Sequence, residues 1–147
     1  MSPRAHRRGP PVVFVVDASV ALAWCFADEA SELADRILDQ LEHDEALTAA
    51  IWPLEVANGL RTAERRGRLD LADLSRVREL LVSLPVQVEG VPLDAALGEV
   101  TELARQLDLT AYDAAYLALA ARRGLALATV DDRLRRACER AGVELVG

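Results

Sequence analysis

The sequence contains no lysine, because all 17 of its basic residues are arginines. This absence excludes mechanisms that need an ammonium group, such as a phosphate-binding loop lysine, a Schiff base or a lysine general base. Histidine is also scarce: only His6 and His43 occur, and there is no Gly-x-Ser-x-Gly motif. Histidine-driven and serine-nucleophile chemistry are therefore disfavoured. Carboxylate and guanidinium groups remain as the reactive side chains.

Cysteine is equally rare. Cys25 and Cys138 lie far apart and belong to no C-x-x-C motif, which predicts two buried thiols in a reducing cytosol and excludes a zinc module. A chain of 147 residues is long enough for one domain that buries about two-thirds of its unfolded surface. We therefore expect a core that needs neither a disulfide nor a structural metal.

Long apolar runs are missing too. None reaches the roughly 20 residues of a membrane-spanning helix. Asp17 also interrupts the apolar segment that follows the basic N-terminus, which disfavours a secretory signal. The first eleven residues, MSPRAHRRGPP, predict a disordered basic arm (1–11) ahead of a single domain (12–147). We expect a cytoplasmic protein without membrane contact.

Short apolar runs alternate with amphipathic segments along the domain. This alternation predicts an α/β fold in which a central parallel sheet carries helices on both faces. The predicted strands are Val12–Val16, Ala46–Thr48, Val86–Val88, Leu125–Thr129 and Val143–Val146. The first predicted helix begins near Ala18. The later predicted helices are Ser31–His43, Pro53–Arg66, Asp70–Leu84, Leu93–Leu107, Ala111–Arg123 and Arg133–Arg140.

Three acidic residues stand alone in apolar segments: Asp17, Glu55 and Asp113. A fourth, Asp131, follows a predicted strand and has Asp132 beside it. An ionised carboxylate in apolar surroundings must be neutralised, paired with a cation or bound to a metal. Because the carboxyl ends of parallel strands share one edge of the sheet, we expect these acids to converge there.

Each acid also has a structural explanation. Asp17 or Ser19 can cap the helix that follows, and a negative charge at Glu55 is favoured near a helix N-terminus. Thr110 and Asp113 have the spacing of a capping box, as do Thr129 and Asp132. Four converging carboxylates nevertheless favour Mg²⁺ or Mn²⁺, which take oxygen ligands. Such a site suits hydrolysis of a phosphodiester by metal-activated water, so we interpret the protein as a nuclease.

The segments VVDASV, PLEVANGL, TAYDAAYLALA and ATVDDRL resemble, in order and spacing, those of the PIN-domain ribonucleases. The resemblance is greatest to the VapC toxins of type II toxin–antitoxin systems, and it extends from Val12 to Val146. It implies a single PIN domain over residues 12–147, usually a homodimer and usually inhibited by a cognate antitoxin.

The same resemblance implies a Mg²⁺- or Mn²⁺-dependent endoribonuclease that cleaves RNA. Asp17 and Asp113 would be the main metal ligands, and Glu55 and Asp131 would complete the catalytic set. Thr129 would support this site by hydrogen bonding, with weaker supporting roles for Ser19 and Asn58. The spacing from Thr129 favours Asp131 over its neighbour Asp132.

Other functions remain open at this stage. A PIN nuclease in RNA maturation and an inactive PIN scaffold that binds a protein partner share these motifs. A phospho-receiver domain is disfavoured because it needs a lysine, and a haloacid-dehalogenase-type phosphatase because Asp17-Ala18-Ser19 is not D-x-D.

Arginines and aromatic residues add expectations about surfaces. The arginines cluster at positions 61, 65, 66 and 68 and at positions 133, 135, 136 and 140. We expect most of them to be solvated and a minority to contact RNA phosphates. A net charge of -7 argues against indiscriminate nucleic-acid binding. For the aromatic residues we expect core or dimer-interface packing; they are Trp24, Phe26, Trp52, Tyr112 and Tyr116.

Overall fold

A computed structural model describes residues 9–29 and 31–147. Most of the expected basic arm, residues 1–8, lies outside the described residues. Within the described ranges, no helix is long and apolar enough to cross a membrane.

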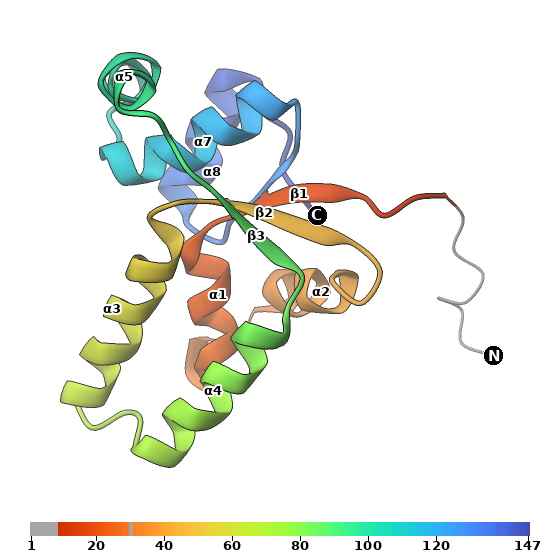
Figure 1. The fold of residues 1–147 in the computed structure, drawn as a ribbon, viewed down its shortest axis with the longest axis vertical. Coiled ribbons are helices and arrows are strands. Elements are labelled where there is room, and N and C mark those ends of the chain that lie inside the picture. Colours follow the sequence, from red (N-terminus) through yellow and green to blue (C-terminus); the bar gives the residue numbers. More distant parts are fainter. Residues whose placement is uncertain (1–8, 30) are drawn as a thin grey trace.

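Four parallel strands form the central sheet in the order β3-β2-β1-β4 (Figure 1). Their bounds are β1 Val13–Val16, β2 Glu45–Ala49, β3 Val86–Glu89 and β4 Leu127–Ala128. Phe14, Val15 and Val16 are buried, as expected for a strand covered on both faces. The predicted parallel α/β architecture is confirmed.

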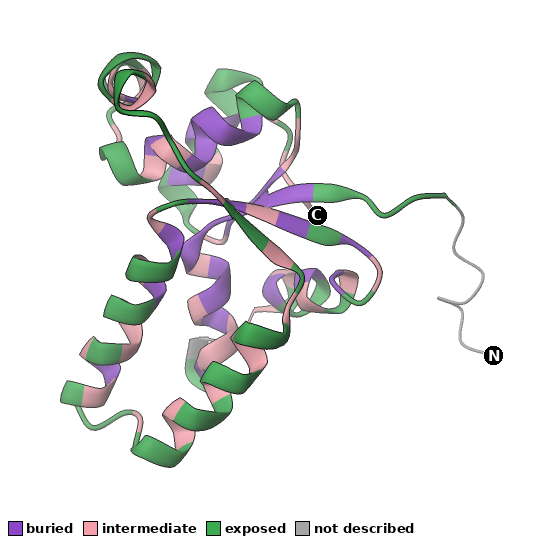
Figure 2. Cartoon of the chain, in the orientation of Figure 1, coloured by how far each residue is buried: buried purple, intermediate pink, exposed green. Residues whose placement is uncertain are grey.

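Helices cover both faces of this sheet. Figure 1 shows α1 to α4 on one side and the chain from α5 to α8 on the other. The helical segments are α1 Ala18–Cys25, the short 3₁₀ turn η2 Ala27–Glu29, α2 Glu32–Gln40, α3 Trp52–Arg65, α4 Leu71–Ser83, α5 Leu93–Ala95, the π-helical η3 Ala96–Val100, α6 Thr101–Leu107, α7 Ala111–Arg123 and α8 Asp132–Ala141. Buried residues concentrate on the strands, α1 and α7, whereas α4 has none (Figure 2).

The prediction for the last two strands is wrong in extent. β4 covers only two of the residues in Leu125–Thr129, and Val143–Val146 contributes a single bridge, Leu145 to Leu127. The ends of β4 are bound elsewhere: the Leu125 N–H donates to the Ala120 carbonyl of α7 (2.9 Å), and the Thr129 carbonyl accepts from Arg135 (2.8 Å). These bonds replace strand pairing at both ends.

The predicted helix Leu93–Leu107 is helical throughout but not uniform. Its middle, η3, is a π-helix. The Thr101 hydroxyl donates to the Ala96 carbonyl, five residues earlier, at 2.7 Å. This side-chain bond matches the wider π turn, which periodicity does not reveal.

Candidate active site

Asp17 follows β1 directly and is 4% exposed. Its Oδ1 accepts hydrogen bonds from the Ser19 hydroxyl (2.7 Å) and the Val20 N–H (3.2 Å), so Asp17 caps α1 as one of its structural explanations predicts. Its Oδ2 accepts from the Thr129 hydroxyl at 2.5 Å. Both carboxylate oxygens are therefore held by named donors.

Thr129 and Ser19 join the turn after β1 to the turn after β4. The Thr129 hydroxyl also accepts from the Asp131 N–H (3.1 Å), and the Ser19 hydroxyl accepts from the Val130 N–H (3.1 Å). Both side chains thus lie beside Asp17, as the sequence predicts.

Burial raises the pKa of Asp17 from 3.8 to about 6. The hydrogen bonds from Thr129, Ser19 and the Val20 N–H oppose this rise, and the negative charge of Asp131 adds to it. The site therefore holds an ionised Asp17 at a cost in free energy.

Asp131 caps α8, since its Oδ1 accepts from the Leu134 N–H at 3.1 Å. The expected capping box between Thr129 and Asp132 is wrong, because the N-cap of α8 is Asp131 and the Thr129 oxygen accepts from the Asp131 N–H instead. The charge of Asp131 is among the causes that raise the pKa values of Asp17 and Asp113.

Asp113 lies in the first turn of α7, where its N–H donates to the Thr110 hydroxyl at 3.1 Å. The pKa of Asp113 is raised, first by burial and then by the charges of Asp131 and Glu55. Arg133 and a hydrogen bond with Thr110 act in the opposite direction. The charges of an acid at the start of α8 and of an acid in the first turn of α3 therefore both act on Asp113.

Glu55 lies in the first turn of α3, and its Oε1 accepts from the Tyr116 hydroxyl at 2.5 Å. Tyr116 is 1% exposed and comes from α7, three residues after Asp113. Residues three apart share a helix face, so the spacing of Asp113 and Tyr116 in TAYDAAY already places their side chains on the same face of the helix. The expectation for Tyr116 was packing alone; its ring is buried as expected, but its hydroxyl serves the site.

Asn58 is not part of this arrangement. It is exposed on α3, and within the described ranges its side chain makes no hydrogen bond. Trp52 is a residue that sequence reasoning assigned only to packing. Its indole N–H donates to the Asp17 carbonyl at 3.0 Å and so fixes the start of α3 against the end of β1.

The chemistry of the donor set fits a hard divalent cation. The acids occupy the N-terminal caps or first turns of α1, α3, α7 and α8, and none forms an ion pair with an arginine in the described part of the chain. Positive helix ends and a cation both favour such charges. No three carboxylate, histidine or cysteine side chains among the described residues are preassembled around one point. Binding of an ion by several of these acids therefore requires side-chain adjustment.

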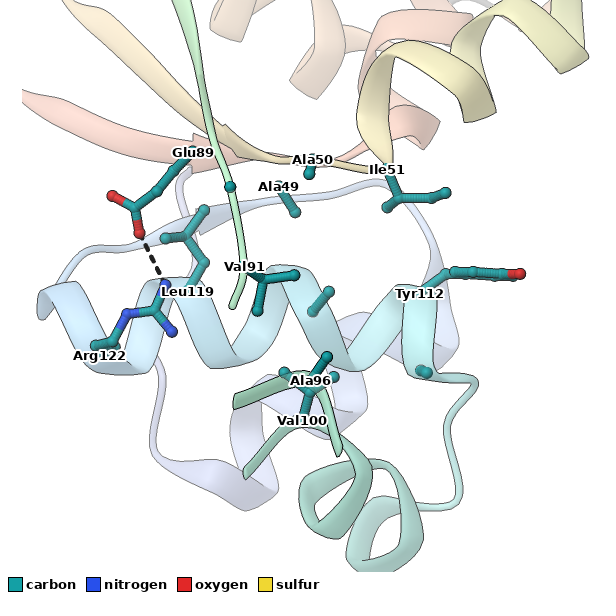
Figure 3. Close-up of a pocket in the computed structure, with 13 residues that line it drawn as sticks. Ala49, Ala50, Ile51, Glu89, Val91, Ala96, Val100, Tyr112, Leu119 and Arg122 are labelled. Carbon is teal, nitrogen blue, oxygen red and sulfur yellow. Dashed lines mark hydrogen bonds and ion pairs between the residues drawn. The ribbon is translucent and has the colours of Figure 1, made fainter. Parts of the chain in front are cut away.

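A mostly apolar cavity of about 320 Å³ lies along α7, and none of the four acids is among the residues that line it (Figure 3). Tyr112, next to Asp113 in sequence, is at one end and is 57% exposed, so its ring is not part of the core of this chain, and packing at a dimer interface stays a prediction. At the other end Arg122 pairs with Glu89 at 2.8 Å. The cavity runs past η3, whose Ala96 and Val100 form part of its wall.

The arginines of the two clusters have different partners. Arg61 pairs with Glu64 on the surface at 3.1 Å, as expected for a solvated face. Arg135 binds the Thr129 carbonyl, a structural role. Arg133 is exposed and lowers the pKa of Asp113, which places a cation at the rim of the acidic site.

Comparison with known proteins adds independent information. The family model of the PIN domain matches residues 14–140. Ribonuclease VapC3 of Pyrobaculum aerophilum is 36% identical over 120 residues, which cover 82% of this chain and 90% of that protein. Ribonuclease VapC3 of Mycobacterium tuberculosis is 35% identical over 136 residues, covering 91% and 93%.

Among solved structures, the crystal structure of PAE2754 from Pyrobaculum aerophilum superimposes with a TM-score of 0.65 at 30% identity, covering 86% of each chain. The parallel sheet, the order of the acid-bearing motifs and the match over residues 14–140 agree. This chain belongs to the PIN-domain family.

Proposed function

We propose that this protein is a Mg²⁺- or Mn²⁺-dependent endoribonuclease whose catalytic carboxylates are Asp17, Glu55, Asp113 and Asp131. The observation that carries the proposal is the mutual electrostatic effect of these acids, which contributes to the raised pKa values of Asp17 and Asp113. Similarity to two proteins named Ribonuclease VapC3 supports RNA as the substrate.

Asp17 and Asp113 would hold the metal ion, and Glu55 and Asp131 would complete its environment. The chemistry that such an ion supplies is acidification of water and stabilisation of charge on the leaving oxygen. A cation at this position also relieves the repulsion among the acids, which is the reason for expecting one.

The chain itself contributes orientation. Ser19 and Thr129 fix both oxygens of Asp17, so this carboxylate does not rotate freely. Arg133, at the rim, offers a guanidinium to an RNA phosphate. With a net charge of -7 distributed over the whole chain, RNA binding depends on such local cations and on the shape of the RNA.

The biological role that we propose is that of a toxin in a type II toxin–antitoxin pair, with a cognate antitoxin and a homodimeric state. The support is the similarity to proteins that carry the VapC name. The surface offers apolar area for protein partners: Leu71 on α4 is 76% exposed, and Leu97 on η3 is 70% exposed. Either helix face can be covered in an assembly.

The decisive experiment is cleavage of total cellular RNA by the purified protein with Mg²⁺ or Mn²⁺, with EDTA, and with Asp113→Asn. Asp132→Asn is the matched control, because Asp132 is a neighbouring exposed acid that is not among the four proposed catalytic carboxylates. We expect discrete fragments from the wild type and the control, and none with EDTA or Asp113→Asn. Equal cutting by wild type and Asp113→Asn would show that the acids do not catalyse it.

A further inference from the structure

Tyr116 places a hydroxyl against one of the four acids from inside the core. Its oxygen lies 2.5 Å from Oε1 of Glu55, a short distance for a bond between a phenol and a carboxylate. The ring is buried among core residues, and the bond joins α7 to α3. Two of the acid-bearing helices are thus linked at the site itself.

The direction of this hydrogen bond is fixed. A tyrosine hydroxyl is protonated at neutral pH and an ionised carboxylate can only accept, so the Tyr116 hydroxyl donates. Glu55 is therefore the acceptor, and one of its two oxygens is held in place. A glutamate side chain otherwise has considerable rotational freedom, and Glu55 is only half-buried.

The origin of the hydroxyl on α7 matters as well. Tyr116 lies three residues after Asp113, on the same face of the same helix. One rigid element therefore carries Asp113 and also the group that restrains Glu55.

We propose that Tyr116 is a positioning residue, whose hydroxyl sets Glu55 relative to Asp113 so that the acids can share a divalent cation. The inference rests on the proposed nuclease function and adds a residue to it. A buried tyrosine needs a hydrogen-bond partner in any case, so a purely structural role for this bond is the competing explanation. The two explanations differ in what removal of the hydroxyl does to metal binding.

The test compares Tyr116→Phe with Tyr112→Phe in the full-length protein. Both substitutions remove one phenolic hydroxyl from α7, but that of Tyr112 lies on an exposed ring. Mn²⁺ affinity is measured by isothermal titration calorimetry without RNA. We expect about a tenfold to hundredfold loss for Tyr116→Phe, the usual effect of removing a group that orients a metal ligand, and no change for Tyr112→Phe.

A second pair of variants tests whether Tyr116 acts through Glu55. If it does, the double variant Glu55→Gln/Tyr116→Phe binds Mn²⁺ no more weakly than Glu55→Gln alone. In RNA cleavage, Tyr116→Phe should need about tenfold more Mg²⁺ for half-maximal rate. Its melting temperature should fall by only about 4 °C or less, because the ring still packs.

The outcomes separate the two proposals. If the wild type binds Mn²⁺ and cleaves RNA but Tyr116→Phe matches it in both, the positioning role is wrong and the nuclease stands. Additive losses in the double variant also overturn the role. If the wild type neither binds Mn²⁺ nor cuts RNA, both proposals fall.

Discussion

Replacing Asp17 by asparagine should make the metal-free protein more stable while abolishing its cleavage of RNA. Burial is the largest cause of the raised pKa of Asp17, so the folded state holds the ionised carboxylate at a cost. Asparagine has nearly the same shape and no charge. Its oxygen can still accept from Ser19 and Val20, and the Thr129 hydroxyl can turn toward Ser19, whose oxygen lies 3.3 Å away.

The size of the effect follows from the two pKa values. Each tenfold difference in proton affinity corresponds to about 1.4 kcal/mol. The rise from 3.8 to about 6 therefore makes the ionised Asp17 cost about 3 kcal/mol in the folded state at pH 7.5. Loss of the bond accepted from Thr129 reduces the gain by about 1 kcal/mol. A net stabilisation of about 2 kcal/mol remains.

The stabilisation expected from Asp17→Asn should decrease as the pH is lowered. Because the folded protein binds the Asp17 proton more tightly than the unfolded chain, wild-type stability rises as pH falls through about 6 toward 3.8. The cost relieved by Asp17→Asn then shrinks, from about 3 kcal/mol at pH 7.5 to about 2 at pH 5.5 and about 1 at pH 4.5. The difference between the proteins must narrow with acidification.

Urea unfolding followed by circular dichroism, in EDTA, measures this difference at several pH values. Asp132→Asn serves as the control, because Asp132 is exposed and its replacement should change stability by only a few tenths of a kcal/mol. The reasoning is refuted if Asp17→Asn is less stable than the wild type at pH 7.5, or if its advantage does not change with pH.

Two further predictions concern positions around the site. Thr129→Val should lower the free energy of unfolding by about 1–3 kcal/mol, because it leaves a buried Asp17 oxygen and the Asp131 N–H without their partner. Thr129→Ser keeps the hydroxyl and should retain most of the stability. Urea unfolding of both variants measures the difference, and equal losses would contradict the role of the hydroxyl. Gly142→Ala should lower the free energy of unfolding by about 1 kcal/mol, because Gly142 ends α8 with a φ of 72°. Gly98→Ala, on the exposed helical surface of η3, should leave stability unchanged or raise it. Thermal unfolding of both variants tests this difference, and equal effects would refute it.

The candidate acids could be picked out from the sequence because a charged residue inside an apolar segment is conspicuous. Asp17, Glu55 and Asp113 are isolated in apolar segments, and helices that begin at one sheet edge place their first turns together. The parallel sheet was predictable for the same reason, since β-branched runs such as Val12–Val16 alternate with amphipathic segments. Both inferences depend on local composition, which the sequence contains.

Features that depend on competition between partners were not predictable. Val143–Val146 has the composition of a strand, but β4 offers it only one bridge because the ends of β4 are bound by other groups. Asp131 rather than Thr129 caps α8, and the Thr129 oxygen accepts from the Asp131 N–H. The π segment likewise depends on where the Thr101 hydroxyl finds an acceptor. None of these choices has a pattern of its own in the sequence.

Capping and chemistry are not competing explanations for Asp17. Its Oδ1 caps α1, yet serine or asparagine can cap a helix about as well without an ionisable group. The raised pKa of Asp17 means that the carboxylate is a costly choice at this buried position, and the charge of Asp131 increases the cost. Helix capping therefore explains why a polar residue follows β1 but not why that residue is charged. The divalent cation that we propose, shared with the neighbouring acids, would compensate this charge.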